Sequence, residues 1–411
     1  MAHKPTNPYY HPEERGNGYS PRPTSPYNEK GGANAVQQRA AAARRKKAAH
    51  KKRVHRLMAV LAVVLVGCGV VCFAVYNLLN NLVTGGAAPL PDDIVTEDAL
   101  QGDVVNILCA GIDFEEGRNY PNGMGFTDVI LYVSFDIKAN KISMLQIPRD
   151  TYIGDAADTG GTGKINAVAM HSESDPPIAA LASLINQQFK LPIDYYITID
   201  MDAFKEAINA LGGIEVTIPR DIVDDYGNTL PAGTHKIDGA TAEFMVRQRH
   251  MYGNQDIGRL EMQRYMYSAL LKTFKSLPLT DAIKLIPTYI KYVKTDINLA
   301  KMYSLANKVV KVPSENILMF TMPGEGCTVN KQSVFSTHLE ATAEILNEYF
   351  RPYSDPVSAD QLGLIELQNT VSSVNDGTGQ SMDSIDDGTA QWGQGNIPDE
   401  PETSSSSAPA A

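Results

Sequence analysis

Cysteine is scarce in this chain, with four residues in 411. Cys68 and Cys72 lie in an uncharged run, which leaves Cys109 and Cys327 outside it. Two cysteines permit one disulfide without implying it, and the place of Cys109 inside the apolar run 104–110 favours a buried free thiol. No CxxC pair or histidine cluster accompanies these cysteines. The sequence therefore argues against a structural zinc site.

Charged residues are absent from residues 57–76, a run of twenty. At about 1.5 Å per residue, a helix of this length covers the roughly 30 Å of a bilayer's hydrocarbon core. The run exceeds the roughly 7 to 15 apolar residues of a signal peptide. A buried helix and a signal peptide cleaved near residues 86–88 are the alternatives. We predict a transmembrane helix over residues 57–82.

Positive charge is concentrated before this run and sparse after it. Residues 1–56 hold 13 Lys and Arg against 3 Asp and Glu, which leaves 23 against 44 for residues 57–411. Basic residues beside a membrane helix stay on the cytoplasmic side. We therefore predict a single-pass protein of the cell membrane. Residues 1–56 form a basic, disordered cytoplasmic tail, and the acidic body is extracytoplasmic.

A basic run of this kind could instead bind nucleic acid, because Lys- and Arg-rich segments are general polyanion ligands. Membrane orientation explains the run more simply, since a predicted membrane span follows it directly. The acidic body also argues against DNA binding. We predict no nucleic-acid partner.

Lysine and arginine are absent from residue 371 to the end, where Ser, Gly, Gln and Asp are frequent. Such a composition offers too little apolar surface for a core. We predict a linker and disordered tail over residues 353–411 and a stalk containing Gly and Pro over residues 83–103. The remaining residues, 104–352, number about 250, which is enough for one large domain.

Two kinds of apolar pattern alternate in this domain. Runs of strand length, rich in β-branched residues, occupy residues 104–110, 129–135, 142–147, 194–199, 214–218 and 317–322. Helical spacing occupies residues 178–189, 201–211, 240–249, 258–276, 281–293, 299–310 and 337–350. Gly212 and Gly213 provide a C-cap for the second of these helices. The alternation predicts an α/β domain with a mixed central sheet flanked by helices.

Two carboxylates lie at predicted strand ends. Asp113 follows the first strand, and Asp128 begins the second. Mg²⁺ takes one or two such carboxylates and completes its octahedron with phosphate and water. Either aspartate alone could merely satisfy a turn. The pair makes a magnesium site a working hypothesis.

Arginines recur near these carboxylates. Arg149 and Asp150 follow the third strand, where a turn would direct both side chains toward one end of the sheet. Arg247 and Arg249 cannot share a helical face, so we expect the helix to end or unwind there. Guanidinium groups bind phosphate oxygens through paired hydrogen bonds. Any one arginine could be a surface ion pair, but the set indicates a phosphate site.

Seven segments in order resemble the LytR-CpsA-Psr family of cell-wall glycopolymer ligases. They are ILCAGID (107–113), TDVIL (127–131), MLQIPRDTY (144–152), KINA (164–167), LGGIEV (211–216), residues 239–249 and DIGRLEMQ (256–263). The match covers residues 104–276, the core motifs of a catalytic domain over 104–352. Seven ordered segments make this a far more specific signal than any single motif.

The resemblance implies a Mg²⁺-dependent phosphotransferase outside the cell. Such an enzyme moves a glycopolymer, for example a teichoic acid or a capsular polysaccharide, from an undecaprenyl-pyrophosphate carrier to a peptidoglycan hydroxyl. The partners would be that lipid-linked glycan, peptidoglycan and membrane lipid. A pyrophosphatase that hydrolyses the lipid intermediate and a non-catalytic glycan-lipid binder or envelope regulator are the alternatives.

The resemblance also implies roles for single residues. Asp113 and Asp128 would hold Mg²⁺ on the pyrophosphate, and apolar side chains between sheet and helices would enclose the prenyl chain. The predicted phosphate contacts are Arg149, Arg247, Arg249, Gln263, Lys164 and Arg259. The predicted catalytic residues are Arg149, Asp150, Arg247 and Arg249. Residues proposed beside the prenyl chain are Phe204, Ile208, Leu270 and Phe274, although helical apolar stripes usually form core.

The roles assigned to Asp150 and Arg259 each have an alternative. Asp150 is the candidate base, but it could equally orient Arg149. Arg259 is four residues before Gln263 and shares its helical face, so it could orient that amide without touching phosphate.

The chain departs from the family pattern at two positions. Phe126 and Met262 stand where the family usually has arginine. One phosphate contact is therefore missing or supplied from elsewhere, with Arg118 and Lys164 as the candidates.

Overall fold

The computed structural model describes most of the predicted domain. The described residues are 77, 80–81, 84, 87–91, 94, 103–113, 120, 122–223, 229–247, 256–278, 293–367, 374–375 and 377–388. The predicted cytoplasmic tail and the uncharged run 57–76 lie outside them. Among the described residues, no helix combines the length and apolar character that crossing a bilayer requires. The transmembrane helix stays a prediction.

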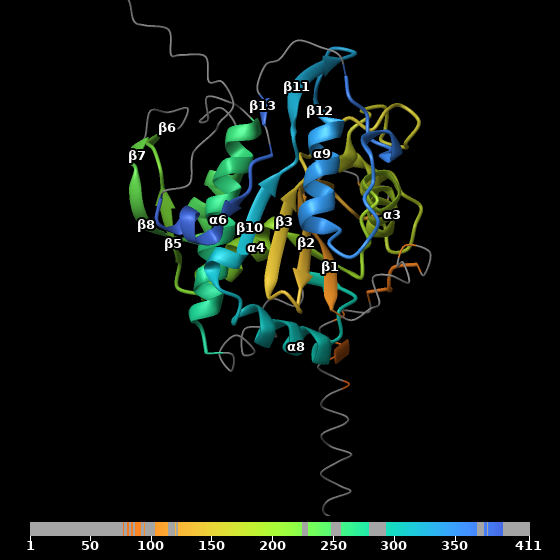
Figure 1. The fold of residues 1–411 in the computed structure, drawn as a ribbon. Helices are drawn as coiled ribbons and strands as arrows, with labels where there is room; N and C mark the ends of the chain where they lie inside the picture. Colours follow the sequence, from red (N-terminus) through yellow and green to blue (C-terminus); the bar gives the residue numbers. More distant parts are fainter. Residues whose placement is uncertain are drawn as a thin grey trace, which may run out of the picture. The chain divides into compact units, whose positions relative to one another are not determined.

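A seven-stranded sheet forms the centre of the domain (Figure 1). Its strands, in spatial order, are β14 (Gln380–Ser381), β10 (Ile317–Thr321), β3 (Lys141–Gln146), β2 (Phe126–Asp136), β1 (Val104–Asp113), β4 (Tyr195–Asp200) and β9 (Val293–Thr295). β1, β3, β4 and β10 run in one direction, and β2, β9 and β14 run in the other. The predicted mixed central sheet is confirmed.

Both faces of the sheet are buried, so neighbouring residues of a strand belong to different cores. In β1, Leu108 and Ala110 pack into one core, whereas Ile107 and Cys109 pack against the other. This alternation follows from the period of two in a strand. Cys109 is a free cysteine, as predicted, and burial raises its pKa to about 12, which disfavours the reactive thiolate.

Helices close the core around Leu108 on one side of the sheet (Figure 1). They are α2 (Val168–His171), α3 (Ile178–Phe189), α9 (Leu339–Ile345) and the π-helical turn η5 (Leu346–Phe350). α3 has the predicted bounds and buries Leu181, Ile185 and Phe189 at intervals of four residues, which gives one apolar stripe. The hydroxyl of Tyr132 donates to the Pro192 carbonyl at 2.7 Å, so this aromatic residue is buried with its polar end satisfied.

Another group of helices closes the second core. They are α4 (Met201–Ala210), α5 (Gly239–Arg247), α6 (Asp256–Ser276) and α10 (Met382–Asp386). Asp200 caps α4 by accepting a hydrogen bond from the Ala203 backbone N at 2.8 Å. Gly212 and Gly213 follow the helix with φ of 75° and 90°, so the predicted glycine C-cap is confirmed.

Shorter elements surround these layers. They are η2 (Ile165–Ala167), the pair β5 (Ile214–Ile218) and β8 (Gly233–Ile237), the pair β6 (Ile222–Val223) and β7 (Thr229–Leu230), α8 (Leu299–Val309), η4 (Ser314–Asn316), η6 (Ala359–Gln361), and the sheet of β12 (Gln332–Thr337), β11 (Gly324–Val329) and β13 (Val374–Asn375). The predicted helix 337–350 is wrong at its start, because Thr337 pairs with Gly324 in a hairpin. The predicted helix 281–293 lies outside the described residues except for Val293, which opens β9.

The prediction of a linker and disordered tail from residue 353 onward is wrong for two segments. Leu362 and Leu364, near η6, are buried in the first core. Further on, β14 pairs with β10, and Met382 and Ile385 of α10 are each 1% exposed in the second core. The acidic composition hid this short helix, although two apolar residues three apart suffice to bury one of its faces.

Asp194 precedes β4 and carries a half-buried carboxylate. Its Oδ2 accepts a hydrogen bond from the Asn106 backbone N at 2.7 Å, and burial raises the pKa of Asp194 from 3.8 to about 6. Between these two values the folded chain binds a proton that the unfolded chain has released. The ionised carboxylate therefore lowers stability above about pH 6, and this loss fades as the pH falls toward 4.

We expect Asp194→Asn to raise the melting temperature at about pH 7.5 by an amount equivalent to roughly 1 kcal/mol. The amide still accepts from the backbone N of Asn106 and carries no charge that burial penalises. The gain over the wild type should shrink as the pH falls from 7 to about 4. Thermal unfolding of both proteins across this range measures it, and a pH-independent difference would contradict the assignment.

Candidate functional site

The predicted site begins at the end of the sheet where β1 and β3 terminate. Asp113 is the last residue of β1 and pairs with Phe126, the first residue of β2. Arg149 follows β3 in a turn closed by the Thr151 backbone N, which donates to the Pro148 carbonyl at 3.0 Å. The carboxyl ends of parallel strands are a common place for ligands in α/β sheets.

Asp128 lies in a β-bulge near the start of β2. Gly111 pairs with Val129, but Ile112 pairs with Thr127, so Asp128 is one extra residue on its strand. A bulge re-aims a side chain and is frequent beside functional sites. Gly111 allows the close approach, because a Cβ there would lie 2.9 Å from Cβ of Val129. The sequence places Asp128 near the strand end but does not predict the bulge.

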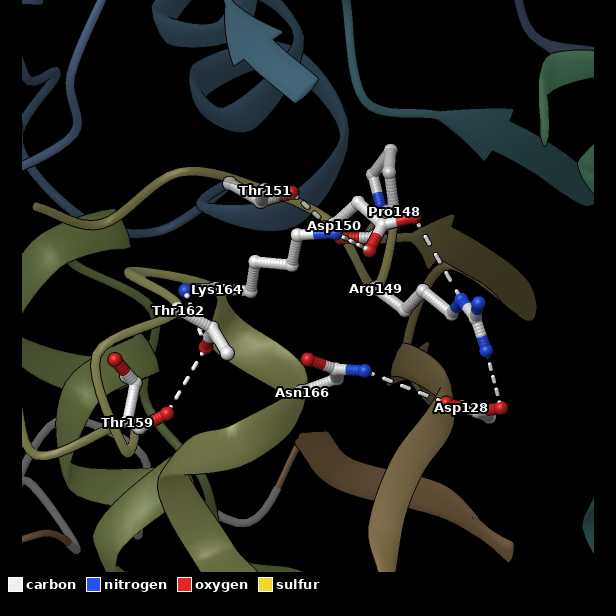
Figure 2. A network of polar contacts seen from close by, with 9 residues as sticks. All are labelled: Asp128, Pro148, Arg149, Asp150, Thr151, Thr159, Thr162, Lys164 and Asn166. Atoms are coloured by element: carbon white, nitrogen blue, oxygen red, sulfur yellow. Dashed lines mark hydrogen bonds and ion pairs between the residues drawn. The ribbon is translucent and has the colours of Figure 1, made fainter. Parts of the chain in front are cut away.

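Asp128 holds Arg149 in place (Figure 2). One carboxylate oxygen of Asp128 accepts a hydrogen bond from Nη1 of Arg149, and the other accepts from Nδ2 of Asn166 at 3.4 Å. The backbone N of Asn166 donates to the Arg149 carbonyl at 3.2 Å, and the Asn166 carbonyl accepts from the Thr127 hydroxyl at 3.1 Å. Asn166, in the KINA segment, is thus a positioning residue that sequence reasoning missed.

Asp150 lies between two cations (Figure 2). Its Oδ1 accepts a hydrogen bond from Nζ of Lys164 at 2.8 Å, and its Oδ2 lies 3.7 Å from Nε of Arg149. The turn after β3 therefore brings both side chains to the same place, as the sequence predicts. This geometry favours the orienting role of Asp150. The residue can accept a proton only after a cation has moved away.

Lys164 is placed by the loop before it, whose backbone requires glycine. Gly160, Gly161 and Gly163 have φ of 61°, 80° and 64°, a region that other residues rarely adopt. A Cβ at Gly163 would lie 2.6 Å from Cε2 of Tyr152. Tyr152 and Lys164 form an antiparallel bridge, which fixes the point where the lysine leaves the loop. The glycines shape this loop.

The charged side chains are partly buried but reachable. The side-chain exposures are 12% for Arg149, 15% for Asp150, 20% for Lys164 and 23% for Asp128. Partial burial strengthens their interactions over those of a surface ion pair. Two carboxylates balance two cations, so an anionic ligand would have to compete with the aspartates for the cations. We call these four residues the Arg149 network.

Gln263 and Arg259 lie on α6, and each is 3% exposed. Nε2 of Gln146, the last residue of β3, donates to the Leu260 carbonyl at 3.0 Å and to Oε1 of Gln263 at 3.4 Å. Gln263 thereby joins α6 to the strand that leads to Arg149. Burial raises the pKa of Tyr267, while the hydrogen bond with Gln146 and the positive charge of Arg259 lower it. Arg259 therefore lies in the interior near this tyrosine.

Two predicted phosphate contacts lie at or beyond the end of α5. Arg247 is the last residue of α5, and Arg249 lies outside the described residues, as does Arg118. Their contacts with a phosphate group stay predictions.

An apolar cavity of about 210 Å³ lies between the sheet and helices α4 and α6. Phe204 and Leu270, both predicted beside a prenyl chain, line it. Ile208 instead packs in the second core, because it lies one turn further along α4. Phe274, one turn beyond Leu270 on α6, is half-buried and also lies outside the lining.

The apolar cavity lies at the same end of the β1–β2 ladder as the Arg149 network. Val129, which follows Asp128 directly, lines the cavity, and so does Gly111, its partner on β1. Gln263 lines it from α6. The site therefore combines a polar network with an apolar cavity whose lining starts one residue after Asp128 along β2.

The segments that form this site lie within a region that matches a known protein family. A model described as the LytR_cpsA_psr family matches residues 87–351. The chain belongs to this family.

Curated relatives in the LytR_cpsA_psr family are transferases by name. One, the polyisoprenyl-teichoic acid–peptidoglycan teichoic acid transferase TagU of Bacillus anthracis, is 27% identical over 281 residues, covering 67% of this chain and 89% of the relative. Another, TagV of Bacillus subtilis, carries the same activity name and is 26% identical over 318 residues, covering 72% and 78%.

Solved structures agree with the fold. The crystal structure of B. subtilis TagV has a TM-score of 0.50 and 27% identity, covering 61% of this chain and 99% of that one. Protein gbs0355 from Streptococcus agalactiae has a TM-score of 0.52 and 22% identity, covering 68% and 95%. The second likeness shows the fold alone.

Phe126 and Met262, the two departures from the family pattern, lie in different surroundings in this LytR_cpsA_psr domain. Phe126 pairs with Asp113 at the start of β2. Met262 is 0% exposed and packs in the second core with Met245 and Met266. An arginine at position 262 would lose this apolar packing. Lys164 provides the network with a second cation in addition to Arg149.

The two aspartates fit magnesium by their chemistry. Carboxylate oxygens are the ligands that Mg²⁺ prefers, and it needs only one or two from the protein when phosphate and water complete its shell. Asp113 and Asp128 lie at the same end of the β1–β2 ladder. Among the described residues, no group of three or more His, Cys, Asp or Glu forms an all-protein metal site. A two-carboxylate site completed by phosphate is the arrangement these residues suit.

Proposed function

We propose that this chain is a membrane-anchored phosphotransferase that moves a glycopolymer from an undecaprenyl-pyrophosphate carrier to a peptidoglycan hydroxyl. The observation that carries the proposal is the apolar cavity beside the Arg149 network. A prenyl pyrophosphate has the same two parts, an apolar chain and a doubly charged head. The relatives named as teichoic acid transferases support an anionic glycopolymer such as teichoic acid as the cargo.

The proposed binding step follows from the two cations. Arg149 would bind phosphate oxygens with its planar group, while Asp128 and Asn166 hold that group in position. Lys164 would leave Oδ1 of Asp150 for a phosphate oxygen, because the doubly charged head attracts the ammonium more strongly. The prenyl chain would lie along Phe204 and Leu270.

The proposed chemical step is an exchange of two bonds to one phosphorus atom. The acceptor hydroxyl attacks the phosphorus next to the sugar, a new P–O bond forms, and the P–O bond to the bridging oxygen breaks. Prenyl phosphate leaves with that oxygen and its electron pair. The hydroxyl proton goes to Asp150 once Lys164 has moved to the phosphate. Arg149 and Lys164 stabilise the charge on the equatorial oxygens.

Mg²⁺ bound by Asp113 and Asp128 would neutralise part of the pyrophosphate charge. We propose it as the cofactor on the strength of this donor pair. The positions of the two residues at one end of the β1–β2 ladder are compatible with that role.

We also propose that residues 57–82 anchor the chain and that the domain lies outside the cell. The uncharged run 57–76 and the basic residues before it support this orientation. An alkaline phosphatase fused after residue 411 is expected to be active outside. Activity confined to a cytoplasmic reporter at the same position would contradict the topology.

The transfer itself is tested with purified full-length chain, a prenyl-pyrophosphoryl oligosaccharide, peptidoglycan fragments and Mg²⁺. We expect release of prenyl phosphate together with a new glycan–peptidoglycan phosphodiester, and loss of both on chelation of the metal. Mass spectrometry of the fragments detects the linkage. Release without linkage would indicate a pyrophosphatase, and binding without release would indicate a non-catalytic binder.

A further inference from the structure

A larger cavity lies at the opposite end of the sheet from the Arg149 network. It has a volume of about 610 Å³, within the roughly 300 to 1,000 Å³ of small-molecule sites. Asp103 and Val104, at the start of β1, line it, whereas Asp113 ends the same strand at the transfer site. The ten residues of β1, at about 3.3 Å each, therefore separate this cavity from Asp113 by about 30 Å. We call it the base cavity.

The base cavity contains a buried acceptor. Asn106 lines it and is 2% exposed. Its backbone N donates to Asp194, but its side-chain Oδ1 has no hydrogen-bond partner within the described part of the chain. Buried acceptors of this kind are rare in folded proteins, because an unmet hydrogen bond is costly. A ligand hydroxyl in the cavity would be a donor for this oxygen.

Three cations line the same cavity: Lys138, Lys190 and Arg351. The Arg351 guanidinium is fixed, since Nη1 donates to the Lys190 carbonyl and Nη2 donates to the Asp355 carbonyl at 3.0 Å. Its buried Nε makes no hydrogen bond to any residue that the structure describes. A fixed guanidinium and two ammonium groups together are suited to phosphate oxygens.

An aromatic ring stands at the entrance. Tyr353 lines the cavity and is 57% exposed, although an exposed tyrosine gains little by packing. Its hydroxyl donates to Oδ2 of Asp136 at 2.7 Å, and Nζ of Lys138 lies 5.8 Å from the ring centroid. These contacts hold the ring at the rim, where its face can contact the C–H groups of a polyol.

We propose that the base cavity binds a polyol phosphate, that is, a phosphodiester flanked by hydroxyl-bearing carbons. The three cations would bind the phosphodiester, and the carboxylates of Asp103 and Asp355 would accept from hydroxyls. The ligand chemistry occurs in a glycerol phosphate polymer and in the headgroup of phosphatidylglycerol.

The test measures binding of a synthetic glycerol phosphate hexamer to purified full-length chain by calorimetry. Lys138→Glu is expected to weaken binding at least tenfold. Lys141→Glu makes the same charge change three residues away, at the first residue of β3 and outside the cavity lining, and should bind as the wild type does. Lys190→Gly is a second variant whose backbone suits the change, because Lys190 has φ of 58°. It should also weaken binding.

A further control separates polyol recognition from simple charge attraction. A linear polyphosphate of matched charge without hydroxyls should bind more weakly. Binding to vesicles of phosphatidylcholine with phosphatidylglycerol identifies the source of the ligand. If Lys138→Glu weakens binding of the hexamer but not of the vesicles, the ligand is a polymer. If it weakens binding of the vesicles but not of the hexamer, the ligand is a lipid headgroup. Equal losses in Lys138→Glu and Lys141→Glu, or equally tight polyphosphate binding, would each overturn the proposal.

Discussion

Arg149→Ala is expected to lower the rate of glycan transfer by about a thousandfold or more. Arginines that stabilise phosphoryl-transfer transition states contribute roughly 10³ to 10⁵ in rate. In this chain the guanidinium is held by Asp128 and lies beside Asp150, so its position is set before substrate binds. Single-turnover release of prenyl phosphate by the full-length chain gives the rate.

Arg149→Lys distinguishes the role of the planar group from that of the charge alone. We expect it to recover only a small part of the lost rate, because an ammonium cannot form the paired hydrogen bonds of a guanidinium. Lys141→Ala removes an exposed charge from the first residue of β3, the strand that leads to Arg149. This variant should transfer at the wild-type rate. An Arg149→Ala protein that retains its melting temperature and its transfer rate would disprove the proposed site.

Asp128→Asn is expected to lower transfer by roughly a hundredfold to a thousandfold, comparable to loss of one preorganised electrostatic group. The amide keeps the size of the side chain in the bulge but removes the charge that faces Arg149. It also removes one of the two carboxylates proposed for Mg²⁺, so the variant should need a higher metal concentration for half-maximal activity. A transfer assay across a Mg²⁺ titration measures both changes.

The matched control lies on the same strand. Asp136→Asn makes the same chemical change at the other end of β2, where the carboxylate accepts from Tyr353. It should leave the transfer rate and the Mg²⁺ dependence unchanged. A similar loss in both variants would mean that Asp128 acts through the stability of β2 rather than through the site.

Local pattern was enough to predict much of the fold. The β-branched runs around β1, β2 and β3 and the apolar stripe of α3 need only short-range periodicity, and the structure has them within a few residues. The hairpin of β11 and β12 was missed because glycine and polar residues interrupt its short apolar stretches. The C-terminal β14 and α10 were missed because their contacts are distant in sequence, with β10 and the second core.

The site was predictable where a strand end fixes a residue and not where a loop or a bulge does. Asp113, Arg149 and Asp150 follow strands, so their common location could be inferred from the chain. The hydrogen bonds that Asn166 makes with Thr127 and Asp128 depend on a β-bulge some forty residues earlier in the chain. No periodicity encodes such tertiary contacts, although the KINA segment was a signal that its asparagine had a role.

The pairing of β14 with β10 has a further consequence for this protein. β10 would otherwise present a row of unpaired backbone N–H and C=O groups, and such strands add to neighbouring copies and aggregate. The two residues of β14 cover part of that strand, and α10 follows immediately. A shortened protein that ends before residue 377 would expose it, so the acidic C-terminal segment protects the solubility of the domain as well as completing its second core.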